Sequence, residues 1–132
     1  MKALFDTNLL IAAAFLNHEW NTIAATQIER VFDKEIVGCL SAHTLAEFYA
    51  VATRYPSSPM PALIAQEFLE ATLQHFEIIE LSAIDYKAGI ARVSSLNLVS
   101  GAIFDALIAQ AALKAGADQL LTFNPKALLE TR

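Results

Sequence analysis

Short β-like runs alternate with longer helix-like runs along the chain, and this alternation restricts the fold more than any other feature. The β-like runs are residues 3–5, 36–40, 77–81 and 119–122. Helical periodicity is expected over residues 9–16, 19–33, 41–54, 61–75, 82–95 and 102–115. Such alternation predicts an α/β fold with three layers, α/β/α, around a central parallel sheet of four to five strands.

Capping signals support several of these boundaries. Ser41 is a favourable N-cap for the third helical stretch, and Ser82 with Asp85 has the spacing of a capping box. Pro61 is expected at the first position of the fourth helix, and Gly116 suits the end of the sixth. We expect residues 1–132 to form one domain, since this length can bury a sizeable core.

Composition excludes some functional classes. The net charge of −5 argues against a broad basic surface for duplex nucleic acid, but it leaves room for a small cleft with a metal and a few cations. The longest apolar run, Leu9 to Leu16, is too short to span a membrane. The single Cys39 is expected as a small buried hydrophobe; it cannot form an internal disulfide, which favours a cytoplasmic location.

Three carboxylates, those of Asp6, Glu47 and Asp105, are flanked on both sides by apolar residues. An isolated ionised carboxylate in such surroundings is unfavourable by several kcal/mol, or it takes up a proton. In parallel sheets, ligands bind outside the carboxyl ends of the strands. We expect the three carboxylates and Asn124 to lie at that edge, where a divalent cation is the simplest group that would make them tolerable.

Each position also has an ordinary structural interpretation. Asp6 is a good N-cap, Asp105 favours the dipole at a helix start, and Glu47 would fit a solvated helix face. His43, four residues before Glu47, does not complete a two-histidine metalloprotease motif and is expected at the helix surface or facing a partner.

Two interpretations are open for Trp20, Tyr49 and Tyr55. Their rings can stack on a nucleobase, or they can pack in the core or in an interface. Neither a Gly-x-Ser-x-Gly motif nor a glycine-rich phosphate loop occurs in a chain with four glycines.

Four short motifs occur in a recognisable order: Asp6-Thr-Asn8, Leu45-Ala-Glu-Phe48, Phe104-Asp-Ala-Leu-Ile-Ala109 and Leu120-Leu-Thr-Phe-Asn124. With these motifs, its length and its βα alternation, the chain resembles the PIN-domain nucleases over essentially its whole length. Within that family it is most similar to the small, single-domain VapC-type toxins of bacterial toxin–antitoxin pairs.

The resemblance implies a metal-dependent endoribonuclease that hydrolyses RNA phosphodiester bonds, as the toxin of a type II pair. It implies Mg²⁺ or Mn²⁺ held by the catalytic carboxylates Asp6, Glu47 and Asp105. It also implies a homodimer and an antitoxin that covers the site and donates a basic residue to it.

Further residues have supporting roles in this hypothesis. Those expected to orient water or a phosphate oxygen, or to support the site, are Thr7, Asn8, Thr122 and Asn124. Asn124 stands where family members often have a fourth acidic residue. A second metal ion would therefore have one negatively charged ligand fewer. Arg54 and Lys126 are candidate RNA contacts.

Two other functions compete with this one. The first is a catalytically weak or inactive PIN-fold module that binds RNA or a protein. The second is a phosphatase or phosphotransferase with Asp6 as nucleophile, although such enzymes usually have a second acid two residues on, where Asn8 stands.

Overall fold

The computed structural model of the chain describes residues 1–123, so the expectations for Asn124 and Lys126 lie outside the described residues. Its elements, in chain order, are β1 (Lys2–Phe5), α1 (Thr7–Ala14), α2 (Asn21–Phe32), β2 (Val37–Ser41), α3 (Ala42–Ala52), α4 (Ala62–Leu73), β3 (Phe76–Ile79), α5 (Ala83–Ser95), α6 (Ala102–Ala115) and β4 (Gln119–Leu121). The predicted alternation is confirmed. None of the helices within residues 1–123 is long and apolar enough to cross a bilayer.

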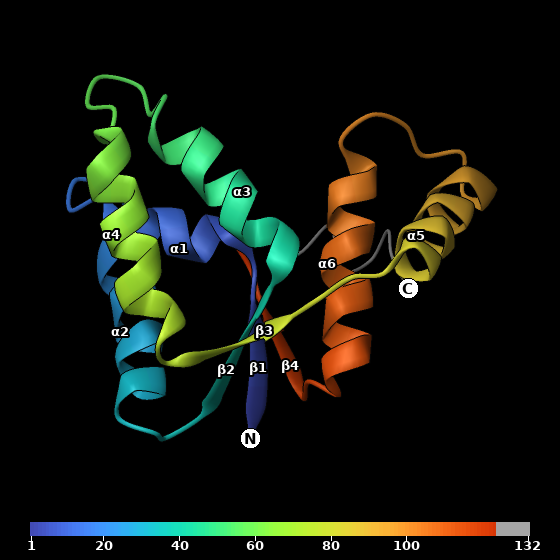
Figure 1. The fold of residues 1–132 in the computed structure, drawn as a ribbon, viewed down its shortest axis with the longest axis horizontal. Coiled ribbons are helices and arrows are strands. Elements are labelled where there is room, and N and C mark those ends of the chain that lie inside the picture. Colours follow the sequence, from blue (N-terminus) through green and yellow to red (C-terminus); the bar gives the residue numbers. More distant parts are fainter. Residues whose placement is uncertain (124–132) are drawn as a thin grey trace.

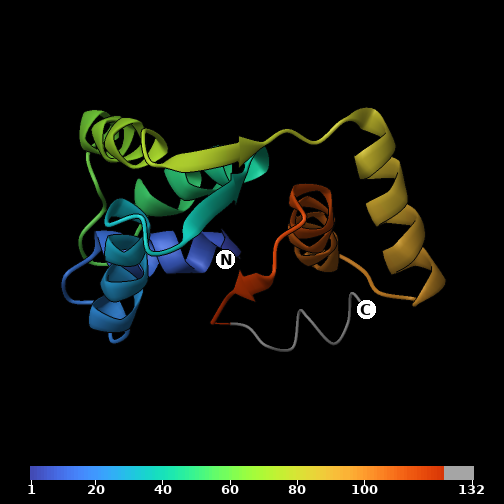
Figure 2. The ribbon, with the colours of Figure 1, turned by 90° about the horizontal axis from the view of Figure 1, so that it is seen from below.

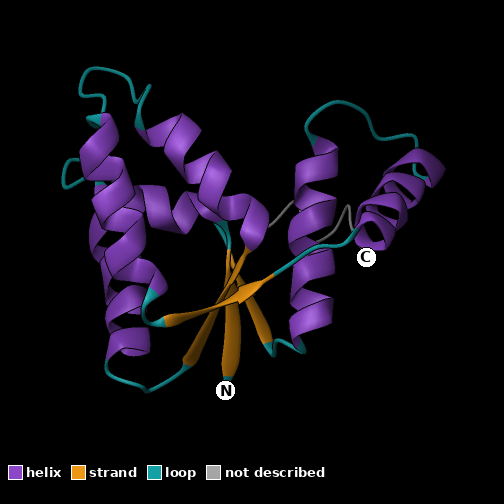
Figure 3. Ribbon diagram, in the orientation of Figure 1, coloured by secondary structure: helices purple, strands orange, loops and turns teal. Residues whose placement is uncertain are grey.

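The four strands form one parallel sheet in the order β3-β2-β1-β4, at the centre of the molecule (Figure 3). Leu4 of β1 is in register with Cys39 of β2 and with Leu120 of β4. Beyond the last register pair, the Asp6 amide donates to the Leu121 carbonyl at 2.9 Å. This bond holds the end of β1, and with it Asp6, against β4.

Helices cover both faces of the sheet, which confirms the predicted three layers. Successive strand residues point to opposite faces. Ala3 and Phe5 therefore join the larger core with α1 to α4, while Leu4 and Cys39 join a smaller core with α6. Figure 1 shows α1 to α4 on one side of the sheet, and Figure 2 shows α6 lying between the sheet and α5.

The helix boundaries follow the local capping chemistry. Ser41 caps α3 by accepting a hydrogen bond from the His43 amide, and Ser82 forms the predicted capping box at the start of α5. Gly116 ends α6 in the left-handed conformation, with φ of 65°. One prediction was wrong: Pro61 is not the first helical residue, because its ψ of 145° keeps it extended and α4 begins one residue later.

The first helix begins and ends two residues earlier than expected, at Thr7 and Ala14. The Asp6 side chain accepts a hydrogen bond from the Thr7 amide, so the helix follows the strand without a loop. Phe15 has an extended backbone that ends the helix, and Leu16 is exposed. The other observed boundaries lie within two residues of those expected.

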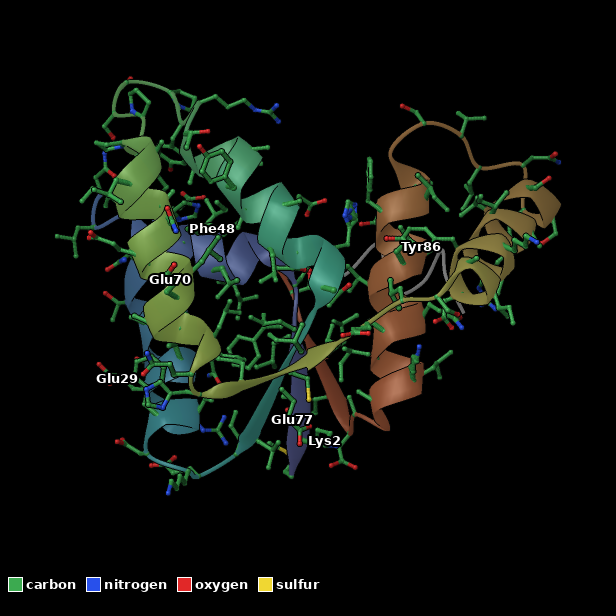
Figure 4. All side chains as sticks on the ribbon, viewed as in Figure 1. Lys2, Glu29, Phe48, Glu70, Glu77 and Tyr86 are labelled. Atoms are coloured by element: carbon green, nitrogen blue, oxygen red, sulfur yellow. The ribbon has the colours of Figure 1, made fainter. Side chains whose placement is uncertain are left out.

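Ring packing holds α3, which carries Glu47, and an ion pair links two strands of the sheet. Phe48, which is labelled in Figure 4, is fully buried on α3. Its ring stacks on that of Phe68 in α4, with centroids 5.0 Å apart. The Lys2 ammonium lies 3.2 Å from the Glu77 carboxylate and links β1 to β3 (Figure 4). The orientation of α3 is therefore set by its buried face, and Glu47 lies at the edge of that face.

A polar network fixes α5 on α6. The Asp85 carboxylate accepts hydrogen bonds from the Ser82 amide and hydroxyl, from the Gln110 amide at 3.2 Å and from the Lys114 ammonium at 2.8 Å. Lys114 also donates to the Glu80 carbonyl at 2.7 Å. These donors, Lys114 foremost, hold the pKa of Asp85 well below its usual range.

Cys39 is fully buried, as expected for a small core residue. Burial, together with the neighbouring Glu77 carboxylate, raises the pKa of the thiol to about 11. Because the thiolate is the reactive form, this cysteine is chemically inert at neutral pH.

Candidate active site

A pocket of about 340 Å³ lies at the carboxyl end of β1, between α1, α3 and the start of α6. Figure 1 shows α3 and α6 on either side of this end of the sheet. The pocket is lined by Asp6, Thr7, Asn8, Ile11, His18, Glu47, Val51, Phe104 and Asp105. All three carboxylates singled out in the sequence therefore face one space, although they come from three different parts of the chain.

Asp6 is both a helix cap and a pocket residue, so its two interpretations are compatible. One carboxylate oxygen accepts a hydrogen bond from the Thr7 amide at 2.7 Å. The other accepts from the Thr122 hydroxyl, also at 2.7 Å. The residue is only 9% exposed, and these two donors fix its orientation from β1 and from the segment after β4.

The surroundings of Asp6 disfavour its negative charge. Burial raises the pKa of this carboxyl above its ordinary value of 3.8, and the nearby Glu47 carboxylate adds to the increase, while the bonds from Thr122 and Thr7 oppose it. Among the described residues Asp6 has hydrogen-bond donors but no cationic partner. The pocket thus favours a proton or a bound cation beside Asp6.

Glu47 and Asp105 reach the pocket from opposite sides. Glu47 lies on the second turn of α3, next to the buried Phe48 that anchors this helix, and Asp105 lies in the first turn of α6. Both are half-buried and line the pocket with Asp6. Because they stand on packed helices, their backbones are held in place without a ligand.

Thr7, Asn8 and Thr122 join the elements around Asp6. The Thr7 hydroxyl donates to the Thr44 hydroxyl at 3.1 Å, which ties α1 to α3. The Asn8 amide donates to the Thr122 hydroxyl at 3.3 Å, and the Asn8 carbonyl accepts from the Phe123 amide at 3.3 Å. Thr44 was missed in the sequence, because nothing in its local pattern signals a contact so distant along the chain.

A second pocket of about 470 Å³ continues the first along α3. It is lined by His43, Ala46, Glu47, Ala50, Val51, Arg54 and Phe104, and it shares Glu47, Val51 and Phe104 with the first. Arg54 is exposed at its far end. The sequence indicated Arg54 but missed Phe104 and Val51, which carry no polar signal, and His18, which had no recognisable context.

Two of the three aromatic side chains with open interpretations pack against other rings. Tyr55 stacks on Phe15 with centroids 3.9 Å apart, and Trp20 lies 4.6 Å from Phe123 at a tilt of 33°. Tyr49 is 42% exposed on α3. Packing therefore accounts for Tyr55 and contributes to the placement of Trp20.

The donor chemistry of the carboxylate pocket fits a hard divalent cation. Asp6, Glu47 and Asp105 offer oxygen ligands, which Mg²⁺ prefers. Because Asp6 is buried beside Glu47, a bound cation would stabilise its negative charge. Within residues 1–123, no group of three or more His, Cys, Asp or Glu side chains lies close enough together to hold a metal ion without other ligands or movement of the side chains. Water or substrate oxygens would therefore complete the coordination, as is usual for Mg²⁺.

Comparison with known proteins agrees with this geometry. The profile of the PIN-domain family, described as "PIN domain", matches residues 3–130. Ribonuclease VapC40 of Mycobacterium tuberculosis is 29% identical over 123 residues, which cover 93% of this chain and 87% of the relative.

Solved structures share the fold. VapC20 of Mycobacterium tuberculosis, described as a sarcin-ricin loop cleaving toxin, superposes with a TM-score of 0.76 at 14% identity, over 96% of this chain and 93% of the other. VapBC2 of Rickettsia felis, solved bound to a DNA fragment from its promoter, gives 0.68 at 23% identity, over 98% and 92%. At these identities, the likeness establishes the architecture of the sheet and its helices.

Proposed function

Since the chain belongs to the PIN-domain family, we propose that it is a metal-dependent endoribonuclease that hydrolyses RNA phosphodiester bonds. The observation that carries this proposal is the single pocket lined by Asp6, Glu47 and Asp105, in which burial and a neighbouring carboxylate raise the pKa of Asp6. The ribonuclease relative VapC40 supports the same activity.

The three carboxylates would hold Mg²⁺ or Mn²⁺ in this proposal, with Asp6 and Asp105 as the first choice of direct ligands. A bound divalent ion supplies an acidified water and offsets the negative charge on the scissile phosphate. Glu47 ligates directly, ligates through water or accepts a proton from the attacking water. Thr122 and Thr7 keep Asp6 oriented through the bonds that its two oxygens accept.

We further propose that residues 1–132 form a single PIN-like domain that acts as the toxin of a type II toxin–antitoxin pair in the cytoplasm. The VapC name of the relative and the VapBC name of one structural neighbour support this role. The expected partners are an antitoxin over the pocket, a second copy of the chain and RNA. Exposed apolar side chains on α5 and α6, including Ile84, Ile90 and Leu113, are compatible with burial in such assemblies.

The test is cleavage of mixed single-stranded and structured RNAs by the purified chain, with Mg²⁺ and Mn²⁺ titrated against an EDTA control. Asp105→Asn and Glu47→Gln should each reduce cleavage at least ~100-fold, because each removes an expected metal ligand. Glu67→Gln is the matched control, since it removes a carboxylate from the exposed face of α4. Mg²⁺ should also raise the melting temperature of the wild type but not of Asp105→Asn.

Unchanged cleavage by folded Asp105→Asn would contradict the assignment of the site. No cleavage by any of the proteins, with circular dichroism showing them folded, would contradict the nuclease. That result would favour a catalytically inactive module that binds RNA or a protein.

A further inference from the structure

Two aromatic rings meet beside the carboxylate pocket: Phe104 lines both this pocket and the second one, and His43 lines the second. His43 in the first turn of α3 and Phe104 in the first turn of α6 have ring centroids 5.3 Å apart, tilted by 42°. Phe104 is 46% exposed although it is fully apolar, and it lines both the carboxylate pocket and the second pocket, which together we call the groove. We call His43 and Phe104 the rim pair.

Helix geometry ties the rim pair to the carboxylates. His43 lies four residues before Glu47, which places the two on one face of α3, a single turn apart. Phe104 immediately precedes Asp105 at the start of α6. Both ring positions are thus set relative to the carboxylates by packed helices, which is the arrangement that a substrate-positioning element requires.

The described side chains that line the two pockets offer little positive charge to RNA beyond what a bound divalent ion would supply. The chain has a net charge of −5, and three carboxylates line the first pocket. Of the described residues that line the two pockets, only Arg54 is a permanent cation. Ala46, Ala50 and Val51 make the wall beside Phe104 apolar. RNA binding at these two pockets therefore gains from a contribution that does not depend on phosphate charge.

We propose that the rim pair stacks on one unpaired nucleobase next to the scissile phosphate and so positions the RNA for cleavage. This inference rests on the proposed nuclease function. Aromatic rings bind any base through its face, whereas a base inside a duplex is covered on both faces by its neighbours. His43 lies in the first turn of α3, whereas Arg54 lies two residues beyond its last residue, Ala52, so Arg54 is placed to contact a more distant phosphate.

A protein partner would also cover an exposed Phe104, and the two occupants differ in what they require. An apolar partner side chain packs equally well on leucine, whereas a nucleobase needs the flat face of a ring. Phe104→Leu therefore separates them, because it keeps the apolar bulk and removes the ring.

Steady-state cleavage of an unstructured RNA pool is the first measurement. Phe104→Leu should raise KM roughly 10- to 100-fold with little change in kcat, which is the size of effect expected for loss of one stacked base. Phe104→Trp should keep a KM close to that of the wild type. Phe32→Leu is the matched control, since Phe32 is 41% exposed on α2 and lines neither pocket of the groove.

Photocrosslinking gives a readout that does not depend on cleavage. Wild-type protein is irradiated with the same RNA pool carrying 5-iodouridine, and the modified residue is identified by mass spectrometry. We expect adducts on Phe104 or His43, and their loss when the RNA is annealed to its complement.

An unchanged KM in Phe104→Leu, or adducts that avoid both rings, would overturn the inference and assign the exposed ring to a protein partner. If the wild type fails to cleave any RNA, the nuclease proposal fails. The crosslink then decides the stacking inference independently, and no adduct on either ring overturns it as well.

Discussion

Replacing Asp6 by asparagine should abolish RNA cleavage without weakening the fold, whereas replacing it by alanine should do both. Asn caps a helix as well as Asp does, so the bond from the Thr7 amide is kept. The Asn amide group can donate to the Thr122 hydroxyl in place of the bond that Asp6 accepts from it. The hydrogen bonding of the site therefore survives in Asp6→Asn, while the buried charge is removed.

Asp6→Asn and Asp6→Ala should differ in free energy of unfolding by the contribution of the helix-capping hydrogen bond. Ala accepts no bond from the Thr7 amide, and loss of such a cap lowers the free energy of unfolding by about 1 kcal/mol. For a chain of this length that difference corresponds to roughly 4 °C in melting temperature. Asp6→Asn should be at least as stable as the wild type at pH 7, because the wild type keeps a carboxylate in surroundings that raise its pKa.

The pH dependence follows from the direction of that pKa change. Folded Asp6 binds its proton more tightly than the unfolded chain does, so ionisation removes stability as the pH rises from about 3.8 through the raised folded pKa. Asp6→Asn lacks this loss. The free energy of unfolding of Asp6→Asn should therefore equal that of the wild type below pH 3.8 and should exceed it increasingly toward neutral pH.

The assay is thermal and urea unfolding of the three proteins in buffer without divalent cations, beside RNA cleavage in Mg²⁺. Divalent cations are omitted from the unfolding experiments because binding to the wild type would mask the effect. A loss of stability in Asp6→Asn at pH 7 as large as that in Asp6→Ala would refute the reasoning, since the charge itself would then be stabilising. Cleavage at the wild-type rate by Asp6→Asn would remove Asp6 from the site.

Two further predictions concern the scaffold. Gly38→Ala should lower the free energy of unfolding by about 1–3 kcal/mol in urea titrations, because its methyl group would lie 2.6 Å from a ring carbon of Phe76, whereas Gly101→Ala, with open space around it, should not destabilise. Lys114→Met should lower the melting temperature at neutral pH, because Lys114 is the chief cause of the depressed pKa of Asp85. That stabilisation is present above the ordinary pKa of 3.8 and is lost as the pH falls through the folded pKa, so the gap between variant and wild type should narrow in acid; a gap that is constant down to low pH would contradict the role of this ion pair.

Local signals account for the parts of the fold that were predicted well. The caps at Ser41 and Ser82 and the stop at Gly116 act within a few residues, so a short stretch of sequence contains everything they need. The errors at Pro61 and at the first helix come from the same short range, where one extended residue or one side-chain bond moves a boundary.

The candidate site was predictable where residue type and strand polarity were sufficient. Carboxylates placed after a strand or near a helix start were expected at the carboxyl edge of a parallel sheet, and Asp6, Glu47 and Asp105 line one pocket there. The sequence could not indicate the Thr7–Thr44 bond or the rim pair of His43 and Phe104. Neither contact has a local pattern, because each joins different helices.

The sequence by itself determined the α/β class, the order of the elements and the edge at which chemistry is possible, since periodicity, caps and strand polarity are local properties. The strand order β3-β2-β1-β4, the placement of α5 outside α6 and the apolar groove that joins Arg54 to the carboxylates were decided only by tertiary structure. Those features depend on which apolar faces of the helices and the sheet pack against one another. That selection is made by packing among side chains far apart in the chain, which no single stretch of sequence contains.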